Sequence, residues 1–263
     1  MNEKIKLLNG EEWDKEEILK RMEDDSFYYG HLGQYALSSS SLKKLLQSPR
    51  AYRNSLRYSD NSSQALRDGR LVHLSILEPE KVKDLIVIEG TKAKKEYKDA
   101  VAEHGDHMVY TESEMNNAFW IADAVLKNNE ASFLLQGCDY EISGVDMIED
   151  IAFRAKADAI SKDRSVIVDL KTTSANIEDW KWEAKKYNYG LQAALYMHIF
   201  NSIEFIFLVV NKSTKDIGIF DCSSSLIEKG QEDFYRAIDI YKEYFTKDNS
   251  NELIDNYVFR GLL

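Results

Sequence analysis

A short charged sequence at the end of an apolar run gives the first indication of chemistry. In IVDLKTT, residues 167–173, Ile167 and Val168 are typical of a buried strand, whereas Asp169 and Lys171 bring charge into it. A buried charge is costly unless it is paired or bound to a metal. Because alternate residues of a strand point to the same side, the carboxylate and the ammonium share one face. They are therefore either an ordinary ion pair at a sheet edge or half of an active site.

A second aspartate precedes this pair. Asp158 lies in KADAI, near the end of a predicted strand that a short polar turn joins to the strand of Asp169. Facing residues of antiparallel neighbours are about 5 Å apart, so the two carboxylates can meet, and they repel each other unless a cation lies between them. Oxygen ligands of this kind suit Mg²⁺ or Mn²⁺.

An amine beside such a cation completes a set suited to phosphodiester hydrolysis. Lys171 could orient or deprotonate a water, or stabilise a developing phosphoryl charge. The alternative reading is a group of surface carboxylates that form ordinary ion pairs with Arg154, Lys156 and Lys171.

Five predicted strands and several helices would position these residues. Apolar patterning and polar turns predict an antiparallel meander at 138–148, 151–160 and 165–171, followed by a strand pair at 205–211 and 216–222. Helices are predicted at 14–23, 38–58 with an interruption near Pro49, 63–78, 93–104, 112–135, 176–200 and 224–246, with a short strand at 84–90. This order is not a regular βαβ array, and it predicts an α/β domain with a mixed central sheet flanked by helices.

Composition limits the class of protein. The chain has 263 residues and a net charge of −11, which argues against a passive nucleic-acid coat but allows an enzyme that confines its basic residues to one groove. Cys138 and Cys222 are too few for a cysteine zinc or iron–sulfur site, and we expect no disulfide. No apolar run reaches about 18 residues and the N-terminus lacks a signal peptide, so we expect a cytoplasmic protein without a membrane span. Residues 1–35 are expected to form a polar lead-in, and 36–263 a single domain.

Several motifs in a fixed order resemble a known superfamily. KADAI, IVDLKTT and YGLQAALY are similar to the core of the PD-(D/E)XK nucleases, in particular to the branch of RecB-type nuclease domains and the RecE (exonuclease VIII) family. Upstream, LRDGRLVHLSILEPE resembles the Gly-x-x-x-His helix of that branch, ALSSSSLKKLLQSPRAYR its serine-rich segment, and YEIS the strand that opens its sheet. The chain has Lys-Ala-Asp where the motif often reads Arg-Pro-Asp. With two cysteines it cannot carry the four-cysteine iron–sulfur cluster of one related branch.

The resemblance implies a restriction-endonuclease-like core and assigns roles to individual residues. Mg²⁺ or Mn²⁺, as one or two ions, would be held by His73, Asp158, Asp169 and the Leu170 carbonyl. Lys171 would activate the attacking water, Gln192 would position it, and Tyr196 would contact the DNA backbone. Possible additions are Glu141 and Glu78. Without the resemblance, His73 reads as a core histidine, and the Gln192–Tyr196 pair as a structural pair on one helix face.

Basic and aromatic residues suggest where DNA would bind. Residues 41–57 contain no acidic side chain and would track phosphates, although such a run is more often a solvated helix face; the basic residues are Lys43, Lys44, Arg50, Arg53 and Arg57. Thr172 and Thr173 would bind phosphate oxygens or serve a turn. The segment DWKWEAKKYNYG, residues 179–190, interleaves lysines with aromatic residues, which either stack on frayed bases or belong to the core.

The RecE resemblance implies a specific activity. It would be processive 5′→3′ digestion of one strand of linear duplex DNA, leaving a 3′ single strand for a RecT-like annealing partner, carried out by a ring-shaped homo-oligomer of phage or bacterial origin. Two alternatives remain open: an endonuclease of the same superfamily that acts on branched or specific sites, and a non-catalytic binding module on this fold. A small-molecule phosphohydrolase is disfavoured because the chain lacks a glycine-rich phosphate loop.

Overall fold

A five-stranded mixed sheet forms the centre of the protein. The computed structural model describes residues 3–57 and 63–260. The strands are β5 (Asp139–Ile148), β6 (Ile151–Ile160), β7 (Val166–Thr173), β8 (Glu204–Asn211) and β9 (Ile217–Asp221), and they follow this order in the sheet. The first three pair antiparallel, β8 is parallel to β7, and β9 is antiparallel to β8. The predicted meander, strand pair and mixed α/β architecture are confirmed.

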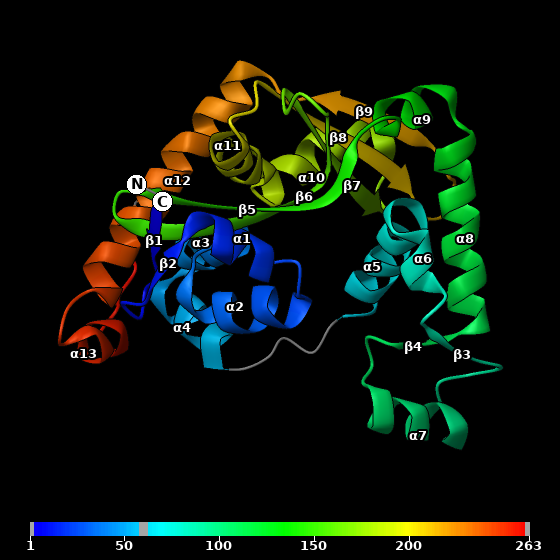
Figure 1. The fold of residues 1–263 in the computed structure, drawn as a ribbon, viewed down its shortest axis with the longest axis horizontal. Coiled ribbons are helices and arrows are strands. Elements are labelled where there is room, and N and C mark those ends of the chain that lie inside the picture. Colours follow the sequence, from blue (N-terminus) through cyan, green and yellow to red (C-terminus); the bar gives the residue numbers. More distant parts are fainter. Residues whose placement is uncertain (1–2, 58–62, 261–263) are drawn as a thin grey trace.

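One face of the sheet is covered by helices from both halves of the chain. They are α3 (Ser39–Gln47), α10 (Trp180–Lys186), α11 (Tyr189–Phe200) and α12 (Ser224–Phe245). In Figure 1, α10, α11 and α12 lie together above the long strands β5 and β6. Their apolar side chains form one core with Phe153 of β6 and Phe207 of β8, both of which are fully buried.

The opposite face carries a second core. It is covered by α5 (Gln64–Leu77), α6 (Pro79–Val82), α8 (Glu112–Lys127) and α9 (Asn129–Leu135), which lie to the right in Figure 1. Leu170 of β7 and Leu208 of β8 point into this core, whereas their neighbours Asp169 and Phe207 do not. Strand alternation therefore separates Leu170 from the two charged residues on either side of it.

The N-terminal lead-in is a folded element. It comprises β1 (Lys4–Lys6), β2 (Glu12–Asp14), α1 (Lys15–Arg21), the wide helical turn η1 (Ser26–His31) and α2 (Leu32–Tyr35). Ile5, Ile18 and Leu32 are fully buried in a third core against Val145 of β5 and Ala152 of β6. The helix predicted at 14–23 is present, but the strands and the packing of this segment on the sheet were not predicted.

Two predicted helices are each broken at an asparagine. The helix expected at 112–135 divides into α8 and α9 at Asn128, whose side chain accepts the backbone N–H groups of Glu130 and Ala131 and so begins a new helix. The helix expected at 176–200 divides into η2 (Ile177–Asp179), α10 and α11. Asn188 has φ +50°, a left-handed conformation that asparagine tolerates better than most residues.

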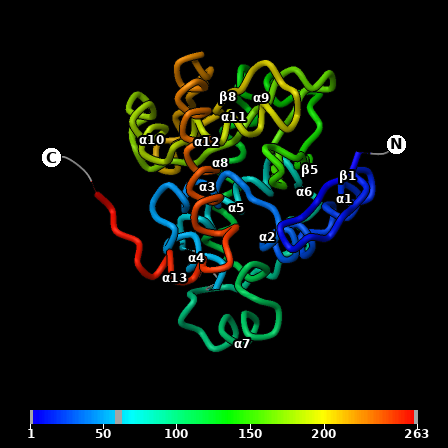
Figure 2. Tube along the Cα trace, turned by 90° about the vertical axis from the view of Figure 1, so that its left-hand side faces the viewer, coloured from blue at the N-terminus to red at the C-terminus, as the bar shows by residue number. Residues whose placement is uncertain are grey.

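The remaining elements complete the two sides. The break predicted near Pro49 separates α3 from α4 (Pro49–Arg57), and the predicted strand near 84–90 is β3 (Ile86–Ile88). Also present are α7 (Lys95–His104), β4 (Val109–Thr111), which pairs parallel with β3, and α13 (Ser250–Asp255); of these, β4 and α13 were not predicted. Figure 2 shows α12 running past α3 toward α13, which lies beside α4. Within the described ranges, no helix is both long and apolar enough to cross a bilayer.

A close helix crossing fixes α11 against the sheet. At the point where α12 crosses α11, a Cβ atom on Gly230 would lie 2.1 Å from the carbonyl oxygen of Gly190. Only two glycines allow the backbones to approach so closely. The crossing lies two residues before Gln192, so it sets the position from which α11 presents that side chain to β7.

Candidate active site

Strands β6 and β7 separate at the residues that the sequence singled out. They pair only at Ala159 with Val168 and at Ile160 with Ile167. At the next position, the Asp158 carboxylate takes the place of a backbone acceptor and accepts the Leu170 N–H at 2.8 Å. The strand opening therefore directs the Asp158 side chain along the sheet toward β7.

The course of β6 also changes at this aspartate. Ala157 packs in the core beneath α11, whereas Ala159 packs in the opposite core beneath α5 and α8. Residues two apart in a regular strand share one face, so the strand changes face at Asp158. This irregularity positions the polar side chain of Asp158 between the two cores.

Three potential ligands converge here. Among the described residues, His73, Glu141 and Asp158 form a group whose ligand atoms all lie within 4.8 Å of one another. His73 comes from α5, and its Nδ1 lies 3.5 Å from an Asp158 oxygen. The imidazole and the first aspartate, 85 residues apart in the sequence, thus lie side by side in the structure. Glu141, which the sequence offered only as a possible addition, is part of the same cluster.

Glu141 occupies an unusual backbone conformation. It lies opposite Asp158 on β5, between the paired positions Tyr140 and Ile142, and has φ +52°. A non-glycine residue in this region costs about 1–3 kcal/mol, and such strain concentrates at functional sites. Burial raises the pKa of Glu141 to about 8, with further contributions from Asp158 and Glu78. A divalent cation would remove the repulsion between these carboxylates.

The second aspartate forms a separate, deeply buried unit. Asp169 is 1 % exposed, one of its oxygens accepts the Gln192 amide at 2.7 Å, and the other is paired with the Lys171 ammonium. Burial raises the pKa of Asp169, opposed by the charge of Lys171. In this conformation Gln192 orients the carboxylate, so it acts on Asp169 and not directly on a water.

Lys171 is a charged side chain in an enclosed place. Burial lowers its pKa, but Asp169 and Asp158 outweigh that effect and hold the pKa above its usual value. Lys171 is therefore an ammonium ion at neutral pH, which favours stabilisation of a phosphoryl charge over removal of a proton. A cation bound to either carboxylate would compete with this ammonium and lower its pKa.

The donor set fits a divalent metal. Carboxylate oxygens predominate, with one imidazole nitrogen, which suits Mg²⁺ or Mn²⁺ better than a thiol-binding metal. The backbone N–H of Leu170 donates a hydrogen bond to Asp158. Metal ligation by the Leu170 carbonyl remains a prediction. Glu78 ends α5 and is paired with Lys81 at 2.6 Å, so it lies at the edge of the cluster.

The predicted basic segment divides into two parts. Arg50 donates to the Ile254 carbonyl at 3.0 Å and Arg53 pairs with Asp255 at 2.7 Å, so both arginines hold α13 against α4. The sequence did not predict this structural role, and we do not include them in a DNA-binding surface. The Lys43 ammonium instead lies 4.6 Å from the centre of the Tyr189 ring. Burial is the main cause that lowers the pKa of Lys43 to about 7, and the positive charge of Lys171 contributes to it.

Tyr196 and Thr172 lie further inside than the resemblance implied. Tyr196 is 9 % exposed and its ring packs edge-on against Phe200 and Phe205. Its position is that of a core residue, so a contact with the DNA backbone is not part of our proposal. The Thr172 hydroxyl faces Gly69 of α5, where a Cβ atom would lie 3.4 Å away. Thr172 therefore lies against α5, the helix that carries His73.

Sequence reasoning missed the contribution of the lead-in. Asp25 pairs with Lys156 of β6 at 2.6 Å, and the same ammonium lies over the ring of Tyr29 at 5.3 Å. Both Asp25 and Glu141 influence Lys81 at the edge of the cluster, so the lead-in borders the site. No motif marks Asp25, and only the fold brings it near β6.

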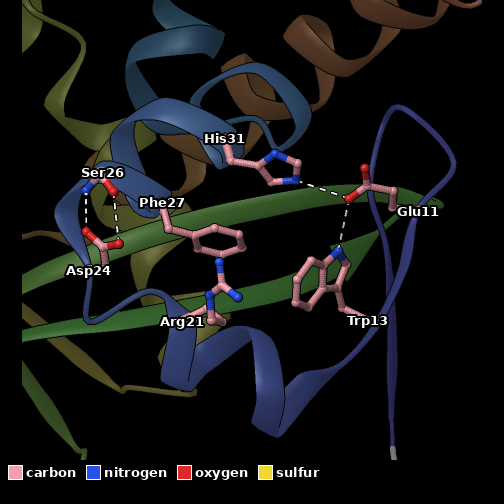
Figure 3. A pocket seen from close by; sticks show the side chains of 7 residues that line it. All are labelled: Glu11, Trp13, Arg21, Asp24, Ser26, Phe27 and His31. Atoms are coloured by element: carbon pink, nitrogen blue, oxygen red, sulfur yellow. Dashed lines mark hydrogen bonds and ion pairs between the residues drawn. The ribbon is translucent and has the colours of Figure 1, made fainter.

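A pocket with a volume of about 410 Å³ lies within the lead-in and is shown in Figure 3. Its polar side chains are paired with one another. Glu11 accepts the Trp13 indole N–H at 3.2 Å and pairs with His31 at 3.1 Å, while the Arg21 guanidinium lies over the Phe27 ring at 4.9 Å. This pocket lacks a convergent group of free donors, and we assign it no chemistry.

Comparisons with known proteins agree with the fold. A family model described as a PDDEXK-like domain of unknown function (DUF3799) matches residues 38–252. A crystal structure from Eubacterium rectale, described as a "Putative exonuclease", has a TM-score of 0.64 and 16% identity, and the alignment covers 91% of this chain and 95% of that chain. At this identity the likeness shows a shared fold.

A phage related exonuclease from Haemophilus somnus 129PT aligns with 12% identity over 79% of this chain and 94% of that chain, but its TM-score of 0.33 carries no argument. No curated protein matches the chain. The family match spans most of the sequence, including every residue of the candidate site. The chain therefore belongs to the DUF3799 family of PDDEXK-like domains.

Proposed function

We propose that this protein is a Mg²⁺- or Mn²⁺-dependent DNA exonuclease of RecE type. The fold and the family support the coarser statement, a PDDEXK-like nuclease. The observation that carries the proposal is the convergence of His73, Glu141 and Asp158 beside the buried Asp169–Lys171 pair. A chain without catalytic use for this cluster would have no evident reason to hold Glu141, half-buried, beside Asp158 and Glu78, whose charges add to the rise of its pKa.

The side chains of the site would divide the work of hydrolysis. His73, Glu141 and Asp158 would hold the cation, which when bound supplies Lewis acidity and lowers the pKa of a water. Gln192 holds the Asp169 carboxylate in one orientation, and Asp169 holds Lys171. The Lys171 ammonium lies where it can stabilise negative charge on the phosphate that is being cleaved.

The finer features are proposals that follow from the resemblance. They are 5′→3′ polarity, a 3′ single-stranded product, a RecT-like annealing partner and a ring-shaped homo-oligomer around linear duplex DNA. The description of the Eubacterium rectale structure as a "Putative exonuclease" agrees with end-dependent cleavage. The negative net charge of the chain also agrees with a ring whose outer surface is acidic and whose channel is basic.

The experiment that tests this proposal compares linear duplexes labelled at the 5′ or the 3′ end, incubated with and without Mg²⁺. A RecE-type enzyme releases the 5′ label first, requires the cation, and leaves covalently closed circular DNA intact. Early release of the 3′ label would contradict the polarity. Cleavage of the closed circle would indicate an endonuclease, and no cleavage of any substrate would favour a non-catalytic module.

A further inference from the structure

A large basic cleft lies beside the candidate active site. It has a volume of about 910 Å³ and is bounded by α3, α10, α11, β9 and the start of α12. Five lysines line it against two aspartates, in a chain whose net charge is −11; the lysines are Lys43, Lys181, Lys185, Lys186 and Lys229. Asp233 is paired with Lys229 and Arg236, Lys229 is also paired with Glu232 at 3.0 Å, and the pKa of Lys43 is lowered to about 7, so the positive charge of the cleft comes mainly from the three lysines of α10. The cleft therefore favours an anionic occupant.

The aromatic residues of the segment 179–190 separate into core and surface. Trp180 is 3 % exposed and stacks on Tyr189 at 5.4 Å, so it belongs to the core. Trp182 is 57 % exposed and Tyr187 is 47 % exposed. Tyr187 lines the cleft, and Trp182 lies beneath two lysines that line it. The segment therefore leaves two aromatic rings accessible to a ligand at this cleft.

Lysine ammonium groups lie over both exposed rings. Those of Lys181 and Lys185 lie 5.3 and 5.1 Å from the centre of the Trp182 ring, and that of Lys186 lies 5.0 Å from the Tyr187 ring. Surfaces that bind single-stranded nucleic acid combine these two features: aromatic faces stack on bases, and cations pair with phosphates. The only carboxylate that α10 adds is Glu183, which is 3.7 Å from Lys186.

The cleft meets the catalytic unit through one shared ring. Lys43 lines the cleft, and its ammonium lies 4.6 Å from the centre of the Tyr189 ring, while that of Lys171 lies 5.3 Å from the same ring. Phe207, at the base of the cleft, is the direct partner of Asp169 in the sheet. The cleft therefore borders the catalytic unit, and the Tyr189 ring is in contact with a lysine of each.

We propose that this cleft binds the unpaired end of a DNA strand adjacent to the scissile phosphate, with bases stacked on Trp182 and Tyr187. The inference rests on the proposed nuclease function and extends it by assigning a single-strand site. Inside a duplex both faces of each base are covered by neighbouring bases, and a blunt end exposes only one face of its last pair, so an unpaired strand is the form that can offer two successive bases to these rings. The volume also falls within the range of about 300–1,000 Å³ of pockets that enclose organic ligands.

The test is a binding measurement that needs no cleavage. Fluorescence anisotropy of a labelled oligothymidylate is measured in EDTA with the full-length protein and with the double variant Trp182→Ala/Tyr187→Ala. We expect the double variant to bind at least about 10-fold more weakly. The variant Trp182→Phe/Tyr187→Phe should retain most of the affinity because it keeps two aromatic faces.

Trp120→Ala is the matched control. Trp120 is 65 % exposed and carries the Lys215 ammonium 3.8 Å above its ring, so it has the same chemistry, but it lies on α8 over the opposite core. This variant should bind the oligonucleotide as the wild type does. Lys181→Gln and Lys185→Gln should each reduce the slope of log affinity against log salt by about 0.7 if each lysine contacts a phosphate.

The results separate this inference from the nuclease proposal. If the double variant binds single strands as the wild type does, or loses affinity for blunt duplex to the same extent, the single-strand assignment is overturned. Because the assay is done without a divalent metal, its outcome does not depend on whether the protein cleaves DNA. If the wild type digests DNA with Mg²⁺ but the double variant binds single strands as well as the wild type does, the single-strand inference fails while the nuclease proposal stands.

Discussion

Lys171 is the side chain on which the proposed chemistry depends most directly. Its ammonium is buried against Asp169, where it can stabilise charge on a reacting phosphate. We predict that Lys171→Ala lowers the rate of Mg²⁺-dependent digestion by about 10²–10³-fold, the loss typical of removing one preorganised charge-stabilising group. The control is Lys162→Ala, which removes an exposed lysine from the turn between β6 and β7 and should leave the rate unchanged. Equal rates for Lys171→Ala and the wild type would remove Lys171 from the mechanism.

The pKa of Glu141 predicts how metal binding depends on pH. Its carboxyl has a pKa of about 8 in the metal-free protein, so a cation that binds it at pH 6 must displace a proton. We expect the affinity for Mn²⁺, measured by calorimetry, to rise between pH 6 and 8. Glu141→Gln should bind more weakly and with a flatter pH dependence. A steep dependence that persists in Glu141→Gln would exclude this residue as the titrating ligand.

The same carboxyl predicts the sign of a stability change. Because its pKa is raised above the unfolded value, the stabilisation from its protonated form is fully present below about pH 4.5 and is lost as the pH rises through about 8. Metal-free protein should therefore lose stability over this interval, as monitored by chemical denaturation. Glu141→Gln should lose less over the same interval.

Single residues of the site were predictable to the extent that a motif names them. His73, Asp158, Asp169, Lys171 and Gln192 were named from residue types in a fixed order. The structure places His73 and Asp158 in one cluster with Glu141, and Asp169, Lys171 and Gln192 in a second, separate group. The left-handed conformation of Glu141 could not be predicted, since it depends on the strand opposite. Nor could the roles of Arg50 and Arg53, because their partners lie about 200 residues away.

At the scale of elements, the five strands of the central sheet were predicted more accurately than the helices, whereas the short strands β1, β2 and β4 were missed. Apolar patterning marks β5 to β9 because each strand is buried on at least one face. The helix breaks at Asn128 and Asn188 were missed because asparagine also occurs inside helices. Whether it caps a helix or adopts φ +50° is decided by the packing of the segments on either side.

The crossing of α11 and α12 gives a prediction at this scale. A methyl group on Gly230 would meet the Gly190 carbonyl, which belongs to the backbone and cannot move aside. Gly230→Ala should destabilise the protein by about 1–3 kcal/mol by overpacking, although alanine is normally the better helix former. Gly30→Ala is the control, since its Cβ atom would meet nothing within 4 Å. Thermal denaturation of both variants measures the difference, and a stabilised Gly230→Ala would contradict the close crossing.

At the scale of the whole molecule, the lead-in and the sheet should unfold together. Leu32 is fully buried between the lead-in and strands β5 and β6. Leu32→Ala should lower the free energy of unfolding by about 2–5 kcal/mol while preserving a single transition seen by both circular dichroism and tryptophan fluorescence. Leu66→Ala, which removes a side chain 62 % exposed, should change stability by less than about 0.5 kcal/mol. Two separate transitions would show that residues 3–35 form an independent unit.

The most direct measurement is the release of nucleotides from linear duplex DNA as a function of Mg²⁺ concentration, by the wild type and by Asp158→Asn. This substitution keeps the shape of the side chain and its acceptor for the Leu170 N–H but removes the charge that the cation would neutralise. We predict digestion by the wild type only in the presence of the cation, and a loss of at least about 10–100-fold in Asp158→Asn. Undiminished digestion by the wild type in EDTA, or by Asp158→Asn in Mg²⁺, would contradict a metal-dependent nuclease built on this site.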